Sequence, residues 1–321
     1  MKTCSRGDWL LPLVDQYLDP GQCGGLKNTS IQHYLIKLLD FIHKGLDQRT
    51  PHAVVVAAID LSKAYNRGSH QLVIEDLHNM HVPNWILSLL CSYLSSRSLV
   101  LKYQGTEAAP RQLPGGFGAG TLLGGFLFIV KFNGICMRPP VPRQLTGNSA
   151  MQVKYIDDST KAATINLKSS LIPDNESRPL PLNYYERTKM IINPSENILQ
   201  DELNKFHVEV TANKLVINEK KSQIMVCNPS KTITFPPEFS IGPSGILEVK
   251  PVLKILGIQI QNDLKWGAQV EQMVTKASSK IWMLRRMKQL GVDERTKSIN
   301  VRSIYIYNVN SPCIAKNKFN S

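Results

Sequence analysis

Residues 54–65 read VVVAAIDLSKAY, and residues 153–159 read VKYIDDS. In each stretch an apolar, β-prone run ends in aspartate, which is where a buried strand delivers a side chain to a cleft. Asp60 ends the first run, and Asp157 and Asp158 end the second. We expect the fold to bring the two segments together as adjacent antiparallel strands, with three carboxylates at one place.

Three carboxylates on neighbouring strands suit the binding of two magnesium ions for nucleotidyl transfer, with manganese as a substitute. Magnesium takes oxygen ligands, and two ions can clamp the attacking and leaving oxygens of an in-line displacement. The alternative for the second segment alone is a surface hairpin turn, because aspartate is also a common turn residue. Asp60 at the end of its own apolar run favours the metal site.

The bulk composition indicates an anionic partner. The chain has 321 residues, enough for one large or two modest domains, and its hydrophobic content of 42% can form a core. The net charge is +13, which points first to nucleic acid, since lysine and arginine release counterions from phosphates. A basic protein without such a partner is the alternative.

The cysteines and the N-terminal sequence predict an intracellular protein of the nucleus or cytoplasm. No Cys-x-x-Cys pair is present, which argues against zinc and a disulfide framework. We expect neither a signal peptide nor a membrane partner, because no apolar run approaches roughly 18 residues. The six cysteines lie far apart, at Cys4, Cys23, Cys91, Cys136, Cys227 and Cys313.

Periodicity and turn residues predict a mixed α and β chain. Helices are expected at 31–42 after a Ser30 cap, 70–80, 84–95, 121–130, from a Ser195 cap to about 212, and 267–290. Strands are expected at 54–59 and 99–103, and a turn followed by a strand at 215–226. The remaining expected elements are a glycine-rich loop at 112–120, an exposed loop at 166–195 and a hairpin at 253–260.

Other residues are candidates for binding or catalysis. The Tyr65 ring can lie beneath the sugar of an incoming nucleotide and exclude a 2′-hydroxyl, or be an ordinary core aromatic. Lys221 can protonate or stabilise a departing pyrophosphate, or be a solvated turn lysine. Residues 115–121 permit close approach of a nucleic-acid backbone but lack the lysine of a phosphate loop. Residues 251–302 hold ten lysines and arginines against four acidic residues, which suits a duplex backbone.

In order, these segments resemble the reverse transcriptase domain of non-LTR retrotransposons and related mobile elements. The resemblance covers roughly residues 20 to 302, and the ordered set is far more specific than any one member. Its motifs are a fingers motif at 22–30, four palm motifs at 60–65, 113–128, 155–158 and 218–222, and a primer-grip hairpin around 256–257.

The resemblance implies an α+β right-hand polymerase fold, with a palm built on an antiparallel sheet, partial fingers and a helical thumb. The implied divisions are fingers at 1–50, palm at 51–235 with its loop at 166–195, primer-grip hairpin and basic thumb at 236–302, and a tail at 303–321. The implied partners are an RNA template, a DNA primer and deoxynucleoside triphosphates.

The resemblance also assigns roles. Asp60, Asp157 and Asp158 would hold the metals, with the Leu61 carbonyl as an extra ligand and Lys221 as a further catalytic residue. The remaining assignments are Tyr65 as sugar gate, Ala119 and Gly120 at the nucleotide, and Leu256, Gly257, Lys276 and Lys280 at the primer–template.

The chain departs from the family pattern in two places. Gly118-Ala119-Gly120 stands where the family usually has Pro-Gln-Gly, and few residues precede the fingers motif. These departures leave open a second hypothesis, a truncated and catalytically weak or inactive palm that only binds nucleic acid. A viral-type RNA-dependent RNA polymerase is a third, which Tyr65 disfavours.

Overall fold

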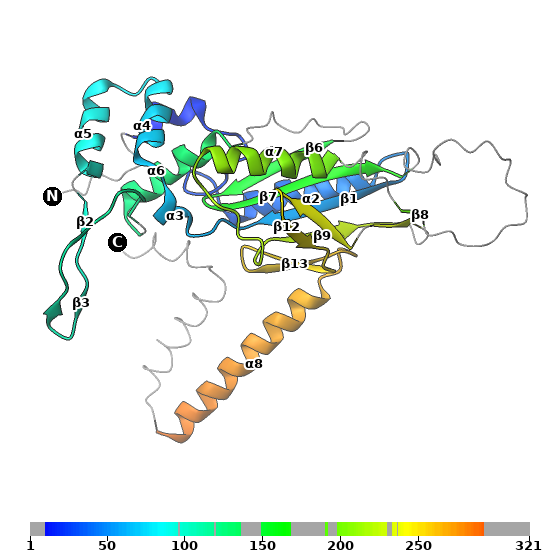
Figure 1. Cartoon of the computed structure of the whole chain (residues 1–321). Helices are drawn as coiled ribbons and strands as arrows, with labels where there is room; N and C mark the ends of the chain where they lie inside the picture. The colour runs from blue at the N-terminus through cyan, green and yellow to red at the C-terminus, as the bar shows by residue number, and fades with distance from the viewer. Residues whose placement is uncertain are drawn as a thin grey trace, which may run out of the picture. The chain divides into compact units, whose positions relative to one another are not determined.

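The computed structural model describes residues 10–95, 97–118, 120–135, 149–167, 190–191, 198–229, 233–235 and 237–291. Ala119, Ser195, the tail at 303–321 and nearly all of the predicted loop at 166–195 lie outside these residues. The chain divides into two compact units, residues 1–250 and 251–321, which are described separately (Figure 1).

A four-stranded sheet forms the centre of the first unit. It contains β1 (His52–Ile59), β6 (Ala150–Tyr155), β7 (Asp158–Asn166) and β9 (Gln223–Cys227), in the order β6-β7-β1-β9. All three pairings are antiparallel. The predicted buried strand at 54–59 is confirmed as the interior strand β1, with seven of its eight residues buried. The α+β class with an antiparallel sheet is therefore correct.

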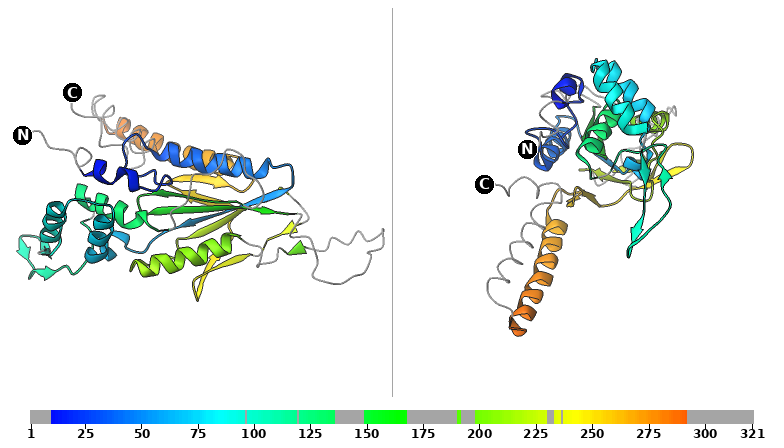
Figure 2. Two further views of the ribbon diagram at one scale, coloured as in Figure 1. Left: turned by 90° about the horizontal axis from the view of Figure 1, so that it is seen from above. Right: turned by 90° about the vertical axis from the view of Figure 1, so that its left-hand side faces the viewer.

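Helices cover both faces of this sheet, as Figure 2 shows. Side chains alternate between faces along a strand, and β7 makes the alternation visible. Thr160 accepts a hydrogen bond from Tyr34 of α2 (Ile31–Leu46), whereas the Lys161 Nζ atom lies 3.2 Å from the Glu202 carboxylate of α7 (Ile198–Ala212). Successive residues of one strand thus anchor helices on opposite faces.

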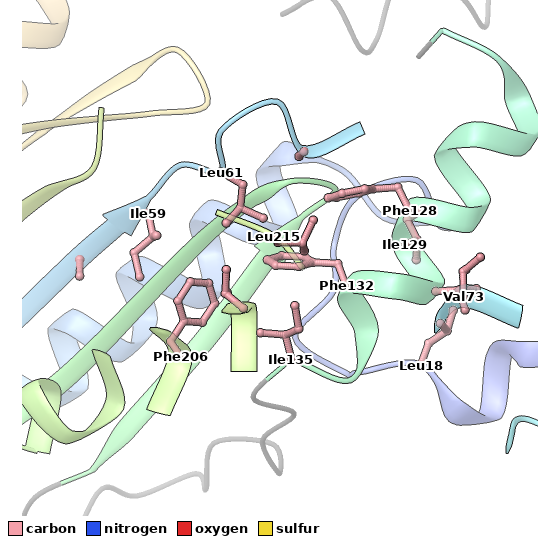
Figure 3. Packing of buried hydrophobic residues seen from close by; sticks show 14 of the residues in the cluster. Leu18, Ile59, Leu61, Val73, Phe128, Ile129, Phe132, Ile135, Phe206 and Leu215 are labelled. Carbon is pink, nitrogen blue, oxygen red and sulfur yellow. The ribbon is translucent and has the colours of Figure 1, made fainter. Parts of the chain in front are cut away.

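Three of the four helices that the structure describes between β1 and β6 occur where the sequence predicts them, and the short first one is not predicted. The four are α3 (Ala64–Arg67), α4 (His70–Asn79), α5 (Asn84–Ser95) and α6 (Leu122–Asn133), and they follow α1 (Leu11–Val14) and the short η2 (Asp15–Tyr17). Nearly all of α6 is buried, as its apolar sequence indicates. Thr121 caps it by accepting a hydrogen bond from the Gly124 N–H at 3.0 Å. Figure 3 shows Phe128 and Phe132 of this helix in the core.

The predicted strand at 99–103 is wrong as a continuous element. The structure has two short antiparallel pairs instead, β2 (Ser98–Leu99) with β5 (Arg111–Gln112), and β3 (Lys102–Tyr103) with β4 (Thr106–Glu107). The Leu101 side chain is 68% exposed, so no buried face enforces a regular ladder here. The remaining strands of this unit are β8 (Met190–Ile191), β10 (Ile233–Thr234), β11 (Glu238–Ile241) and β12 (Gly245–Glu248).

The second unit contains a hairpin and one long helix. The hairpin joins β13 (Val252–Ile255) to β14 (Ile258–Gln261), and α8 spans Gly267–Gln289, so both predictions are confirmed. Within the described residues, no side chain of α8 is buried. Several of its apolar residues, including Trp282, are exposed in this part of the chain, whereas others, such as Leu284, are half-buried.

The expected Ser30 cap of α2 is only partly confirmed. Ser30 does occupy the N-cap position of α2, but its hydroxyl contacts His33 Nδ1 at 2.8 Å and makes no capping bond to the backbone. Among the residues that the structure describes, no helix is both long and apolar enough to cross a membrane.

Candidate functional site

Asp60 directly follows the central strand β1, and both its backbone carbonyl and its backbone N–H form hydrogen bonds. Its carbonyl accepts the Asn218 N–H at 2.8 Å, and its own N–H donates to the Ser222 hydroxyl at 3.1 Å. The Asn218 side-chain amide also donates to Asp60 Oδ2 at 2.9 Å. The segment around Asn218 therefore fixes both the backbone and the carboxylate of Asp60.

Asp157 and Asp158 lie at the hairpin between β6 and β7. Tyr155 pairs with Asp158, which leaves Ile156 and Asp157 as the connecting residues. Ile156 has a φ of 59°, where a β-branched side chain is rarely found. Such a conformation costs about 1–3 kcal/mol and persists only where surrounding contacts hold it. We call residues 155–158 the carboxylate turn.

The sheet register brings the two segments together. Ile59 pairs with Ser159, so Asp60 follows the end of β1 beside the residue that starts β7. The structure therefore brings the two aspartate segments together, but the antiparallel neighbour of β1 is β7, which begins at Asp158, and not β6, the apolar run that precedes Asp157. The roles of the three aspartates in metal binding and catalysis stay predictions.

Burial and mutual repulsion raise the pKa of both turn carboxyls. Burial is the main cause of the rise in the pKa of Asp158 to about 6, and the charges of Asp157 and Asp60 add to it. Burial also raises the pKa of Asp157, with a smaller contribution from Asp60. The three carboxylates therefore form one electrostatically coupled group that a cation would stabilise.

The donor chemistry of this group fits magnesium, because carboxylate oxygens are the ligands that this ion prefers. Across the described part of the chain, no three His, Cys, Asp or Glu side chains are gathered as a metal site. The fit therefore rests on the coupling of three partly buried carboxylates at neighbouring strand ends. Bound ions there would supply Lewis acidity and charge neutralisation.

Leu61 and Lys221 flank the aspartates. Leu61 is buried and forms an isolated antiparallel β-bridge with Ile217. The hydrogen bonds on either side of this bridge are accepted by the carbonyls of Asp60 and Val216, and not by the Leu61 carbonyl. Lys221 is exposed, and its N–H donates to Asn218 O at 3.1 Å in a turn.

Tyr65 is half-buried in the short helix α3. Its ring stacks on that of Phe128, with centroids 4.8 Å apart and planes at 22°. Its carbonyl accepts the Phe117 N–H at 2.7 Å, which ties the glycine-rich loop to α3. Gly120 lies at the exposed end of that loop with a φ of 79°, and Ala119 is outside the described residues.

The predicted primer–template residues all belong to the second unit. Leu256 and Gly257, with φ of 49° and 86°, are the two residues that connect β13 to β14. Lys276 is exposed and Lys280 half-buried on α8. The structure thus confirms a tight hairpin and a basic helix, and their contact with nucleic acid stays a prediction.

Sequence reasoning missed the contact that orients Asp60. Asn218 belongs to the palm motif at 218–222, but the motif alone does not assign its side-chain amide to the site. Asparagine and serine are both common in turns, so the presence of Asn218 and Ser222 in the sequence does not predict that both side chains contact Asp60.

No protein-family model matches the chain, and no curated protein matches it. Among solved structures, the chain is similar to the telomerase of Candida tropicalis, determined in complex with a fragment of telomeric RNA. The identity is 12% and the TM-score 0.48, over 81% of this chain and 38% of that chain. The chain therefore spans less than half of the length of that telomerase.

Proposed function

We propose that this chain is an RNA-directed DNA polymerase domain of a retrotransposon-like element, which transfers nucleotides to a primer 3′-hydroxyl. The observation that carries the proposal is the coupled group of Asp60, Asp157 and Asp158 at the ends of neighbouring antiparallel strands. The ordered motifs of the sequence and its net charge of +13 support the same interpretation.

Each candidate residue has a separate role in the proposed reaction. Asp60, Asp157 and Asp158 would hold two magnesium ions, which would supply charge neutralisation at the reacting phosphate. The primer hydroxyl gives its proton to water, its oxygen forms a bond to the α-phosphate, and the bond from that phosphate to pyrophosphate breaks, so most of the catalysis is positioning and electrostatic stabilisation. Lys221 protonates or stabilises the departing pyrophosphate.

Tyr65 selects the sugar in this proposal. Its ring stacks on Phe128 and is half-buried, so it can turn only at the expense of a well-packed aromatic pair. A ring held in this way excludes a 2′-hydroxyl by contact, which favours deoxynucleotides over ribonucleotides.

Primer extension on an RNA template tests the proposal. Purified chain is supplied with magnesium or manganese and deoxynucleotides, beside Asp157→Asn and a control, Asp47→Asn, at an exposed aspartate at the end of α2. We expect extension by the unmodified chain and the control, and none by Asp157→Asn. Extension that survives Asp157→Asn would refute the site assignment.

A second candidate is a palm that binds nucleic acid without adding nucleotides. The sequence Gly118-Ala119-Gly120, where the resembled family usually has Pro-Gln-Gly, favours it. Salt-dependent binding of a primer–template, with no extension by a folded chain, would support this candidate. Failure to bind at low salt would count against both functions.

A further inference from the structure

The segment Gly21–Gly25 lies along the edge strand that leads into the carboxylate turn. Gln22 and Lys154 of β6 form a parallel bridge. The Lys154 N–H donates to Gly21 O at 3.0 Å, and the Cys23 N–H donates to Lys154 O at 2.8 Å. β6 is an outer strand of the sheet, so this segment covers its edge immediately before the turn.

A buried ion pair anchors the segment to the same strand. Asp19 and Lys154 are 2% and 1% exposed, and Asp19 Oδ2 lies 2.8 Å from Lys154 Nζ. Lys154 Nζ also donates to the carbonyls of Phe132 and Asn133 at the end of α6, at 3.2 and 3.0 Å. The Asp19 N–H donates to Asn133 Oδ1 at 2.6 Å. Strand, helix and segment are thus joined through buried polar contacts.

The segment touches the backbone of the carboxylate turn so closely that no side chain fits between them. A Cβ atom on Gly24 would lie 2.5 Å from Ile156 N and 2.8 Å from the carbonyl carbon of Tyr155. A Cβ atom on Gly21 would lie 2.6 Å from Gln152 O. Because these neighbours are backbone atoms of the carboxylate turn and of the paired strand β6, they cannot move aside without shifting the turn.

We propose that Gly21–Gly25 is a positioning element that holds Ile156 in its left-handed conformation and thereby places the carboxylates of Asp157 and Asp158. The inference rests on the proposed function, because it assigns those carboxylates to metal binding. Ile156 has a conformation that needs external support, and Gly24 supplies the contact at that residue. Gly24 acts only through the turn and touches no reacting atom.

The test compares Gly24→Ala with Gly134→Ala. A Cβ atom on Gly134 would meet nothing within 4 Å, and the φ of this residue is −69°, so the same substitution there is accommodated without strain. We expect Gly24→Ala to lower kcat for primer extension about 100-fold, with little change in the KM for nucleotide, since small displacements of a reacting group have effects of this size. Gly134→Ala should leave kcat unchanged.

A second readout does not depend on catalysis. Mn²⁺ affinity, measured by titration of each folded variant, should fall at least about tenfold in Gly24→Ala and stay unchanged in Gly134→Ala. A chain that binds Mn²⁺ with this pattern but extends no primer would refute the proposed function and support the positioning element. Unchanged kcat and Mn²⁺ affinity in Gly24→Ala would overturn the inference, and a natural chain that binds no Mn²⁺ would overturn both.

Hydrogen exchange covers the case in which Gly24→Ala does not fold. In the natural chain, the amides of Cys23 and Lys154 join the segment to β6, so Mg²⁺ that binds the turn should slow their exchange by linkage. Slower exchange in Mg²⁺ at these amides would support the inference. Exchange that is fast, or is the same with and without Mg²⁺, would overturn it.

Discussion

Asp158→Asn should stabilise the metal-free protein at neutral pH, although it removes a residue of the candidate site. The pKa of Asp158 rises from 3.8 to about 6 in the folded chain, chiefly through burial. The folded state therefore binds the proton more tightly than the unfolded state, and stability falls as pH rises through this window. Above about pH 6 the folded chain carries the full cost of the ionised carboxylate.

The size of the stability difference follows from the shift in the pKa of Asp158. About two units at about 1.4 kcal/mol each give roughly 3 kcal/mol, and we halve this to about 1.5 kcal/mol because the carboxylate is partly exposed to solvent. Between about pH 4.5 and 7.5, the difference in unfolding free energy between Asp158→Asn and the natural chain should grow by about 1 kcal/mol in favour of the variant.

Urea unfolding in EDTA at both pH values measures this difference. Asp47→Asn is the matched control, because it removes the same charge at an exposed position, and its effect should stay within about 0.5 kcal/mol at both pH values. A difference for Asp158→Asn that is constant with pH, or that grows in favour of the natural chain, would refute the reasoning.

Magnesium should reverse the order at neutral pH. A ligand that binds only the folded state stabilises it by about 2.7 kcal/mol at a hundredfold excess over its Kd, which exceeds the advantage of about 1.5 kcal/mol of the variant. We expect this gain in the natural chain and not in Asp158→Asn. An equal gain in both proteins would place the metal elsewhere.

Three further outcomes are expected. Asn218→Ala should slow primer extension about 10- to 100-fold, because the Asp60 carboxylate loses a charge-assisted hydrogen bond; an unchanged rate would show that this contact does not orient Asp60. Phe128→Leu should lower the unfolding free energy by about 1–2 kcal/mol and increase ribonucleotide incorporation, since the Tyr65 ring loses its stacking partner; unchanged sugar selectivity, in a competition assay, would argue against this support. Glu202→Gln should lower the unfolding free energy by about 3–5 kcal/mol in urea, because it removes the carboxylate charge opposite a buried lysine of β7; a loss below about 1 kcal/mol would contradict this.

The sequence predicts the elements whose pattern is local and strong. β1 is an unbroken apolar run, α6 is apolar along its length, and α8 keeps a helical period to its end, so each occurs close to its expected bounds. The interrupted region at 99–103 shows the limit of periodicity. Its apolar residues resemble a strand, but Leu99 and Leu101 face solvent, and a sequence pattern does not reveal whether a partner surface exists.

The sequence predicts the aspartates of the candidate site, but not the residues whose contacts hold them in place. Asp60, Asp157 and Asp158 stand at strand ends that the sequence marks clearly. The contacts that hold them come from Asn218 and Gly24, which are distant in sequence and of residue types common in ordinary turns. Such contacts depend on tertiary packing, which no local pattern encodes.

The order of strands in the central sheet has a consequence for synthesis of the chain. β1 is made early, yet both of its partners, β7 and β9, are made much later, and only the β6–β7 hairpin pairs locally. Pairings between distant segments form slowly, and an unpaired, uncharged apolar strand is prone to aggregate while it waits. The yield of folded protein should therefore depend on translation speed and temperature at the stage when β1 has left the ribosome and β9 has not.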